Sequence, residues 1–329
     1  MATTSTKLGP GPRLAVIMDP IEAIRPAKDT TLALMLEAQR RGYALTCAGG
    51  ENLWATGGTA WIRGRRITVR DDPEHWFEVE ESLVEPLGDF DIVLMRKDPP
   101  FDQEYVYLTY ILELAETAGA RVVNRPRALR DYNEKASILK FPDLTAPTLV
   151  ALDTQRFREF HQREGHIVLK PLDGMGGRGV FVLAPGDPNL SSVVETLTAG
   201  GRAHIMAQRY LPAISEGDKR VLLVNGVPVP YMLARVPAEG ETRGNLAAGA
   251  RGEPRPLGAV ERRIAESVGP RLAADGLSFV GLDIIGEYIT EINVTSPTCV
   301  RELDRAFGLN IAGDFFDAIE MPPAKVPPA

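Results

Sequence analysis

The chain has 329 residues, a length that suggests two domains or three smaller ones, and 44% of its residues are hydrophobic, enough for large cores. The formal charge of −7 and the lack of a basic run argue against a nucleic-acid partner, and no apolar run approaches the ~18 residues that span a membrane. The two cysteines, Cys47 and Cys299, form no CxxC pair, so we expect a cytoplasmic protein without a disulfide framework.

The first part of the chain alternates strand and helix patterns. Expected strands cover residues 13–20, 43–49, 89–102 and 120–124, and expected helices cover 29–42 and 104–119. Asp29 is the predicted N-cap of the first helix and Gly42 its predicted stop. This alternation predicts an open parallel α/β sheet that ends near residue 123, with a small added hairpin at 58–72.

The pattern changes after residues 124–141, which we expect to be helical. Short strands are expected at 166–172, 179–183, 204–211, 220–224 and 227–235, with helices near 152–164, 187–199 and 259–275. Asn225-Gly226 between two strand patterns is a strong hairpin signal. The sequence therefore predicts an α+β, mostly antiparallel second part.

Four glycines cluster in the segment KPLDGMGGRGV at 170–180. Gly174, Gly176 and Gly179 match G-x-G-x-x-G, but a strand pattern follows where a dinucleotide fingerprint needs a helix. A P-loop is also excluded, because Lys170 precedes the glycines. The remaining phosphate-binding interpretation is a loop between antiparallel strands whose backbone N–H groups approach phosphate oxygens, with Lys170 adding charge. The alternative is an ordinary loose hairpin turn.

The segment FVGLDIIGEYITEINVTSP at 279–297 predicts a strand, a turn and a strand. If the turn takes three residues, 286–288, or if the hairpin carries a bulge, then Asp283 pairs with Glu291, and Asn293 lies on the same face. Leu282, Ile284, Ile292 and Val294 then form the apolar face. A two-residue turn would pair Asp283 with Thr290 instead and turn Glu291 toward that apolar face. In the odd register, the three oxygen-bearing side chains suit Mg²⁺, and a solvated polar face is the alternative.

Other catalytic patterns are weak. The four histidines show no zinc-ligand spacing, and the chain has no G-x-S-x-G motif. Cys299 has no identifiable histidine base, so we interpret it as structural.

A lysine followed by a glycine hairpin, together with a later D…E-x-N strand, resembles the ATP-grasp superfamily. The strings LMRKDPPFD, LRDYNEK, LKPLDGMGG, GDKRVLLVNG, FVGLDIIG and TEINVTSPTC resemble bacterial glutathione synthetases, and the resemblance extends from about residue 13 to 318. It implies an N-terminal open parallel α/β domain (1–123), followed by an ATP-grasp fold of two α+β subdomains. These would be a small lid subdomain (124–200) and a C-terminal subdomain with the metal site (201–329).

The resemblance implies ATP-dependent ligation of γ-glutamylcysteine to glycine through an acylphosphate, with release of ADP and phosphate. Mg²⁺ is the implied metal, and the family suggests a homotetramer. Two alternatives remain open: another ATP-grasp carboxylate–amine ligase, and a non-catalytic nucleotide-binding regulator. The resemblance also implies the roles of individual residues. The ATP-binding residues are Lys135, Lys170, Gly174, Met175, Gly176, Gly177, Gln208, Arg209, Tyr210, Leu211 and Asp218, and the metal ligands are Asp283, Glu291 and Asn293.

Four further residues are candidates for the substrates. Arg96 follows a strand of the parallel sheet, at the edge where such sheets bind ligands, and is suited to a substrate carboxylate. Asp19 is similarly placed and is a candidate for the γ-glutamyl amine. Arg220 and Arg235 flank the Asn-Gly hairpin, and we expect them to face the reacting phosphate and carboxylate.

A long Gly/Ala-rich segment at 237–256 is expected to form a loop, and the resemblance implies a second lid over the substrates. The family commonly has GGRGE where this chain has GARGE, with Ala250 at the second position. Alanine would be strained there if that position required a positive φ.

Overall fold

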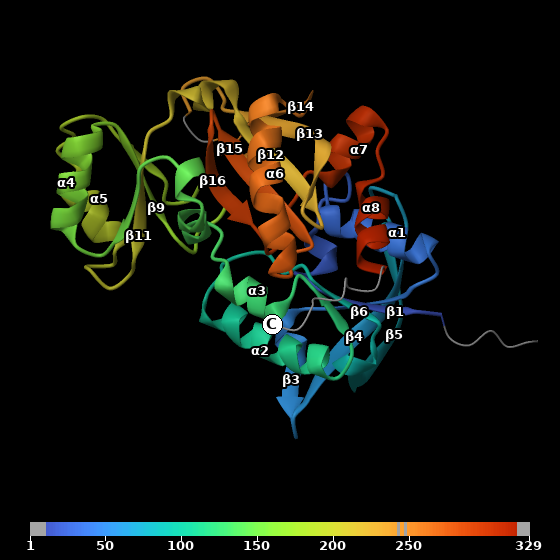
Figure 1. Cartoon of the computed structure of the whole chain (residues 1–329). Coiled ribbons are helices and arrows are strands. Elements are labelled where there is room, and N and C mark those ends of the chain that lie inside the picture. Colours follow the sequence, from blue (N-terminus) through green and yellow to red (C-terminus); the bar gives the residue numbers. More distant parts are fainter. Residues whose placement is uncertain (1–10, 242–243, 247–248, 321–329) are drawn as a thin grey trace, which may run out of the picture.

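The computed structural model describes residues 11–241, 244–246 and 249–320, which form three sheets with helices packed on them (Figure 1). The first sheet has the strand order β3-β4-β2-β1-β6-β7, and β5 pairs with β4. Its parallel strands are β1 (Arg13–Ile17), β2 (Ala44–Ala48), β6 (Ile92–Met95) and β7 (Arg121–Val123). The predicted open parallel α/β arrangement is therefore confirmed.

The two long helices of this part begin at acidic N-caps. Asp29 accepts a hydrogen bond of 2.6 Å from the Leu32 backbone N–H at the start of α1 (Thr30–Arg40). Asp102 does the same for Tyr105 N–H, at 2.9 Å, at the start of α2 (Gln103–Thr117). These caps fix where each helix begins after a strand of the sheet.

The predicted hairpin at 58–72 is wrong. This segment is one long strand, β4 (Thr59–Val69), which pairs antiparallel with β3 (Leu53–Thr56) and with β5 (Phe77–Pro86). The turn lies earlier, at Gly57 and Gly58, whose φ angles are 58° and 79°. Gly64 marks no turn, because its missing side chain instead leaves room for Thr46 on the neighbouring strand.

The segment 124–141 is only partly helical. It contains α3 (Pro126–Asp131) and a 3₁₀ helix at Ala136–Lys140. Between them, the Asn133 side-chain oxygen accepts hydrogen bonds from the backbone N–H groups of Lys135 and Ala136, at 3.1 and 2.9 Å. This local turn competes with helix and explains the break.

The second sheet is antiparallel, with the order β10-β9-β11-β8. Its strands are β8 (Thr148–Ala151), β9 (Ile167–Pro171), β10 (Phe181–Leu183) and β11 (Ile205–Arg209), and α4 (Thr154–Glu164) and α5 (Leu190–Leu197) cover it. β8 is not among the predicted strands, because it has only four residues and lies at the edge of the sheet. This sheet and its helices stand at one end of the molecule (Figure 1).

The third sheet is also antiparallel, with the order β14-β13-β12-β15-β16. Its strands are β12 (Asp218–Val224), β13 (Val227–Val236), β14 (Arg251–Pro256), β15 (Phe279–Ile285) and β16 (Tyr288–Asn293). The predicted turn is confirmed, since Asn225 and Gly226 have φ angles of 46° and 80°. The helices of this part are α6 (Ala259–Ala274), α7 (Val300–Phe307) and α8 (Ile311–Glu320).

The end of the predicted loop at 237–256 is the strand β14. The loop prediction is therefore wrong for residues 251–256, where Pro254 and Pro256 are compatible with a strand because β14 is the edge of its sheet.

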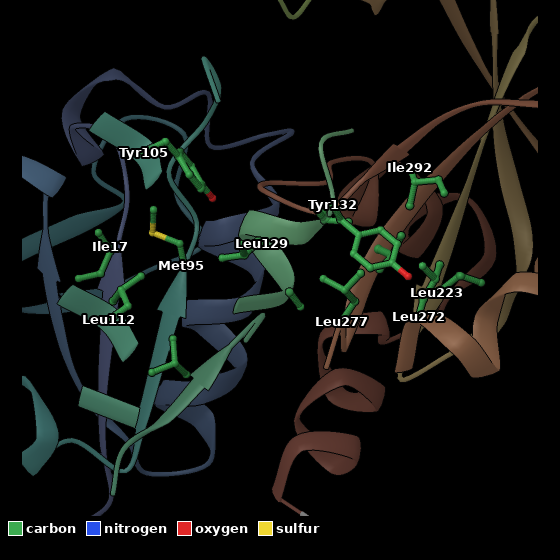
Figure 2. Packing of buried hydrophobic residues seen from close by; sticks show 14 of the residues in the cluster. Ile17, Met95, Tyr105, Leu112, Leu129, Tyr132, Leu223, Leu272, Leu277 and Ile292 are labelled. Atoms are coloured by element: carbon green, nitrogen blue, oxygen red, sulfur yellow. The ribbon is translucent and has the colours of Figure 1, made fainter. Parts of the chain in front are cut away.

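One buried cluster joins the first sheet to the third. Leu129 and Tyr132 lie between Ile17, Met95 and Leu112 on one side and Leu223, Leu272 and Ile292 on the other (Figure 2). The second sheet has its own smaller cluster, which includes Phe157, Phe160 and Leu169. In the described part of the chain, no helix is both long and apolar enough to cross a membrane.

Candidate active site

A cleft opens between the second and third sheets. Its apolar wall comes from Val168, Val180, Val182, Leu211, Ile214 and Ile285, and its polar groups come from Lys170, Gln208, Arg209, Tyr210, Asp218, Thr290 and Glu291. Of the eleven residues predicted to bind ATP, Lys170, Gln208, Arg209, Tyr210, Leu211 and Asp218 line this cleft. The structure thus brings strands β9, β11, β12 and β16 together around one space.

The hairpin of β15 and β16 has the predicted pairing. Asp283 lies opposite Glu291, and Gly281 lies opposite Asn293. Of the two ways to reach this pairing, the three-residue turn is not found, because Ile285 pairs with Tyr288 across a two-residue turn. A bulge at Thr290 supplies the register shift instead. The bulge keeps Glu291 away from Leu282 and Ile292, among which an unpaired charge would be costly to bury.

The Asp283 carboxylate is buried between two arginines. Its Oδ1 accepts from Arg220 Nε at 2.5 Å, and its Oδ2 accepts from Arg220 Nη2 at 3.1 Å and lies 2.8 Å from Arg235 Nη2. Burial alone would raise the pKa of Asp283, but the two guanidinium groups outweigh it and hold this pKa well below its usual range. Asp283 is therefore ionised at neutral pH, as a metal ligand must be.

Glu291 faces two lysines. Its Oε1 lies 3.7 Å from Lys135 Nζ and 4.0 Å from Lys170 Nζ. The Asn293 side-chain N–H donates to Gly281 O at 3.2 Å, which leaves the amide oxygen of Asn293 as a possible ligand. Two carboxylates and an amide oxygen fit a hard cation such as Mg²⁺. Among the described residues, no group of three or more His, Cys, Asp or Glu could hold a metal. A cation held by Asp283, Glu291 and Asn293 would take its remaining oxygens from a ligand or water.

Four cations, Lys135, Lys170, Arg220 and Arg235, surround the carboxylates of Asp283, Glu291 and Asp218, so positive charge is in excess at the site. Lys170 Nζ donates to Thr290 O at 3.2 Å, a carbonyl group of the bulge. Lys135 Nζ donates to Gly174 O in the glycine loop. Burial lowers the pKa of Lys170, and Glu291 partly offsets this effect. Such an arrangement favours a polyanionic ligand such as a triphosphate.

The glycine loop joins β9 to β10, which pair antiparallel as predicted. Gly176, Gly177 and Gly179 have φ angles of 65°, 78° and 69°, in the left-handed region. Met175, directly before them, is 45% exposed, so its side chain is not part of the core. Successive glycines in this conformation let backbone N–H groups form an anion-binding concavity.

Asp218 lies at the base of the cleft. Its Oδ2 accepts from Arg235 Nη2 at 2.5 Å, whereas its Oδ1 is buried and, among the residues that the structure describes, has no hydrogen-bond partner. Burial raises the pKa of Asp218 to about 7, and the neighbouring Asp283 charge adds to the rise while Arg235 opposes it. A buried acceptor without a partner that lines a cleft is suited to a ligand.

Residues 208–211, which we call the hinge, line the same cleft. Tyr210 stacks on His166 with a ring-centroid distance of 4.0 Å, and its backbone N–H donates to His166 O at 2.8 Å. Arg209 Nη2 donates to the Tyr288 hydroxyl at 3.3 Å. These contacts tie the end of β11 to β9 and β16.

Arg96 and Asp19 do not line the nucleotide cleft. Arg96 is buried, and it donates to Thr31 Oγ1 at 3.2 Å and to Pro297 O at 3.0 Å. Asp19 accepts from the Asp98 backbone N–H at 2.9 Å and lines a separate cavity beside Cys47 and Arg65. The segment that follows Asn293 connects this region to the hairpin of β15 and β16, because Arg96 donates to the carbonyl oxygen of Pro297 in that segment.

Two buried residues that hold the hairpin escaped the sequence analysis. Glu134 Oε1 accepts from Val294 N and Thr295 N, both at 3.1 Å, and from Thr295 Oγ1 at 2.7 Å. Asn124 bonds the backbone of Phe279 in both directions and also Val294 O. Polar residues in a polar segment are typical of a surface, so only the adjacent Lys135 could have drawn attention to Glu134.

Parts of the predicted second lid lie outside the described residues, namely 242–243 and 247–248. Gly249 has a left-handed φ of 94°, and Ala250 is not among the residues with a positive φ. The strain considered for Ala250 is therefore not found. Cys47 and Cys299 are free and buried, and Cys299 adopts a φ of 93° before α7.

The sequence matches two family models: the prokaryotic glutathione synthetase N-terminal domain at residues 13–130 and the ATP-grasp domain of the same family at 134–308. A glutathione synthetase of Pseudomonas syringae pv. tomato is 57% identical over 308 residues, which cover 94% of this chain and 97% of the relative. Two solved structures, each covering 93% of this chain and 98% of its own, are similar in fold. They are D-cycloserine synthetase (TM-score 0.63, 16% identity) and a RimK domain ATP-grasp protein from Sphaerobacter thermophilus (TM-score 0.62, 18% identity).

Proposed function

The chain belongs to the prokaryotic glutathione synthetase family, and from that premise we propose how its residues carry out the reaction. The protein is an ADP-forming ligase that joins γ-glutamylcysteine to glycine. The observation that carries the assignment of residues is the position of Glu291. It faces Asp283 across the hairpin and approaches both Lys135 and Lys170, so metal and phosphate groups would meet at one point.

The reaction needs activation because a carboxylate is a poor electrophile. An oxygen of the cysteinyl carboxylate attacks the γ-phosphorus of ATP, and the bond to the ADP oxygen breaks. The glycine amine then attacks the acyl carbon, phosphate leaves with the electrons of the C–O bond, and the amine loses a proton. Water must be kept away from the acylphosphate, which supports a covering role for the glycine loop and the segment at 237–250.

The ATP phosphates would be held by the two lysines and the glycine loop. Lys135 and Lys170, both beside Glu291, would supply positive charge, and the backbone of residues 174–177 would supply N–H groups. The hinge residues 208–211 would contact the adenine. Asp218, with its unpartnered oxygen, would accept a hydrogen bond from the nucleotide.

Mg²⁺ would be held by Asp283, Glu291 and Asn293, and when bound it neutralises charge that develops on the phosphate oxygens. Arg220 and Arg235 already bind Asp283 and lie beside the same face, so they are placed to stabilise the transferring phosphoryl group.

The proposed substrate roles of Arg96 and Asp19 are supported by their positions just after β6 and β1, at the carboxyl edge of the parallel sheet, and Arg96 also contacts Pro297 O. Arg96 would bind a carboxylate of γ-glutamylcysteine, and Asp19 its α-amino group. The proposal also includes a homotetramer and a cytoplasmic location, both of which rest on family resemblance and on the sequence alone.

A coupled assay tests the function directly. Purified protein with ATP and Mg²⁺ should release ADP only when both γ-glutamylcysteine and glycine are present, and glutathione should form in equal amount. Replacing glycine with other amino acids distinguishes this activity from a related carboxylate–amine ligase. ADP release that ignores γ-glutamylcysteine would contradict the proposal.

A further inference from the structure

A short hydrogen-bond relay lies at the edge of the second sheet. Thr148 of β8 and Gln208 of β11 are directly opposite in the antiparallel pair, and Val168 lies opposite Gln208 on the other side. Residues directly opposite in a sheet share a face, and both Gln208 and Val168 line the nucleotide cleft. Thr148 stands one strand further from the cleft and acts on it only through Gln208.

The direction of each hydrogen bond in the relay is fixed by chemistry. Thr148 Oγ1 lies 2.7 Å from the Ala146 carbonyl oxygen, which can only accept, so the hydroxyl proton is used there. The Thr148 oxygen can then only accept from Gln208, at 3.0 Å. The group of Gln208 nearest Thr148 must therefore be its amide NH₂.

This orientation leaves the Gln208 carbonyl oxygen as the group that the side chain offers to the cleft. Gln208 is only 5% exposed, and within the residues that the structure describes no donor bonds its Oε1. An adenine presents an amino group at the 6-position and can donate to this oxygen. A guanine presents a carbonyl oxygen there, which would meet another acceptor.

We propose that Thr148 is a positioning residue for nucleobase selection: it holds the Gln208 amide in the orientation that accepts from adenine and rejects guanine. This inference rests on the proposed use of ATP and adds to it a residue outside the cleft. Without the Thr148 hydroxyl, the amide can turn over and donate to a guanine carbonyl. The choice between bases is then weakened while the phosphate contacts remain unchanged.

Two variants separate this role from a structural one. Thr148→Val keeps the shape of the side chain and removes the hydroxyl, whereas Thr148→Ser keeps the hydroxyl. The ratio of kcat/KM for ATP to kcat/KM for GTP should fall about fivefold or more in the valine variant and stay near the wild-type ratio in the serine variant. Calorimetric titration with ADP and GDP should show the same change in relative affinity without relying on activity.

The outcomes are distinct. An unchanged nucleotide ratio in the valine variant, or an equal loss for both nucleotides, overturns the inference even though the wild type still makes glutathione. A wild type that does not couple ATP to γ-glutamylcysteine and glycine contradicts the proposed function instead. If Thr148→Val fails to fold, Thr148→Ala removes the same hydroxyl, and the same ratio decides.

Discussion

Lys170 is nearly completely buried, and its ammonium group contacts the Thr290 carbonyl and Glu291. We predict that Lys170→Ala raises the KM for ATP and lowers kcat, since a charged contact to phosphate contributes about 1.5–3 kcal/mol. This corresponds to a loss of roughly 10- to 150-fold in kcat/KM. Steady-state kinetics measures it, with exposed Lys28→Ala as the matched control. Unchanged ATP kinetics would contradict a phosphate role for Lys170.

The residues that the sequence predicts correctly share one property: each lies in a local sequence pattern that indicates its chemical role. Lys170 stands beside a glycine cluster, and Asp283, Glu291 and Asn293 alternate with apolar residues on a hairpin. Glu134 and Asn124 have no such pattern, because their partners, mostly backbone groups, lie 155 to 170 positions further along the chain. A long-range hydrogen bond of this kind leaves no periodicity in the sequence.

Asp304, outside the candidate active site, also has a shifted pKa. Half-burial raises its pKa to about 6, although its Oδ1 accepts from Ile311 N–H at 3.1 Å. A carboxyl whose folded-state pKa is raised contributes stability at low pH and loses it as the pH rises from about 4 to 6.

We therefore predict that Asp304→Asn, which can accept the same hydrogen bond, is more stable than wild type at pH 8 and not at pH 4. The expected gain is about 1 kcal/mol, because the side chain is half-exposed and solvent screens its charge. Urea unfolding at both pH values measures this difference. A gain of equal size at pH 4 would show that ionisation of Asp304 is not the cause.

At the scale of elements, the hairpin of β15 and β16 shows what register arguments can decide. Requiring Glu291 to avoid the apolar face correctly predicted that it pairs with Asp283. The same requirement could not distinguish a three-residue turn from a bulge, because both shift the register by one residue. The bulge adds what the turn would not: a Thr290 carbonyl that accepts from Lys170.

The end of β16 is held by Glu134, so Glu134 should control the metal site from a distance. We predict that Glu134→Ala raises the Mg²⁺ concentration needed for half-maximal activity several-fold, because three hydrogen bonds next to Asn293 are lost. Glu134→Gln keeps an oxygen acceptor and should restore most of the wild-type Mg²⁺ dependence. The measurement is activity against Mg²⁺ concentration at saturating ATP.

A purely structural role for Glu134 has a different signature. Glu134→Ala would then lower the melting temperature and the amount of active enzyme, while the Mg²⁺ concentration for half-maximal activity stayed at the wild-type value.

At the scale of the whole molecule, the buried clusters group the chain differently from the sequence-based domains. Both large clusters contain residues of the first sheet together with residues of the third: Ile17 with Leu223 in one, and Leu14 with Leu222 in the other. The second sheet has its own cluster. Among the described residues of its strands, Met206 is the one buried residue that belongs instead to the cluster with Ile17 and Leu223. Predicted boundaries at 123 and 200 followed changes of local pattern, which carry no information about which sheets share a core.

This grouping predicts that residues 148–209 open independently of the rest. A unit of roughly 60 residues buries a smaller fraction of its surface than a large domain does and is marginally stable alone. Its polar ties to the remainder include Lys170 to Thr290, Asn133 to Leu172 and Arg209 to Tyr288. Amide hydrogens in β9 and β11 should therefore exchange with solvent faster than those in β1 and β12.

Nucleotide should remove most of that difference, because it binds in the cleft that the second and third sheets form together. A non-hydrolysable ATP analogue with Mg²⁺, at 100 times its Kd, stabilises the closed state by about 2.7 kcal/mol. The equilibrium constant for local opening then falls about 100-fold. Hydrogen exchange followed by mass spectrometry should show this protection in β9 and β11, with β1 as the internal control. Equal exchange of all four strands without nucleotide would mean that the three sheets unfold as one unit.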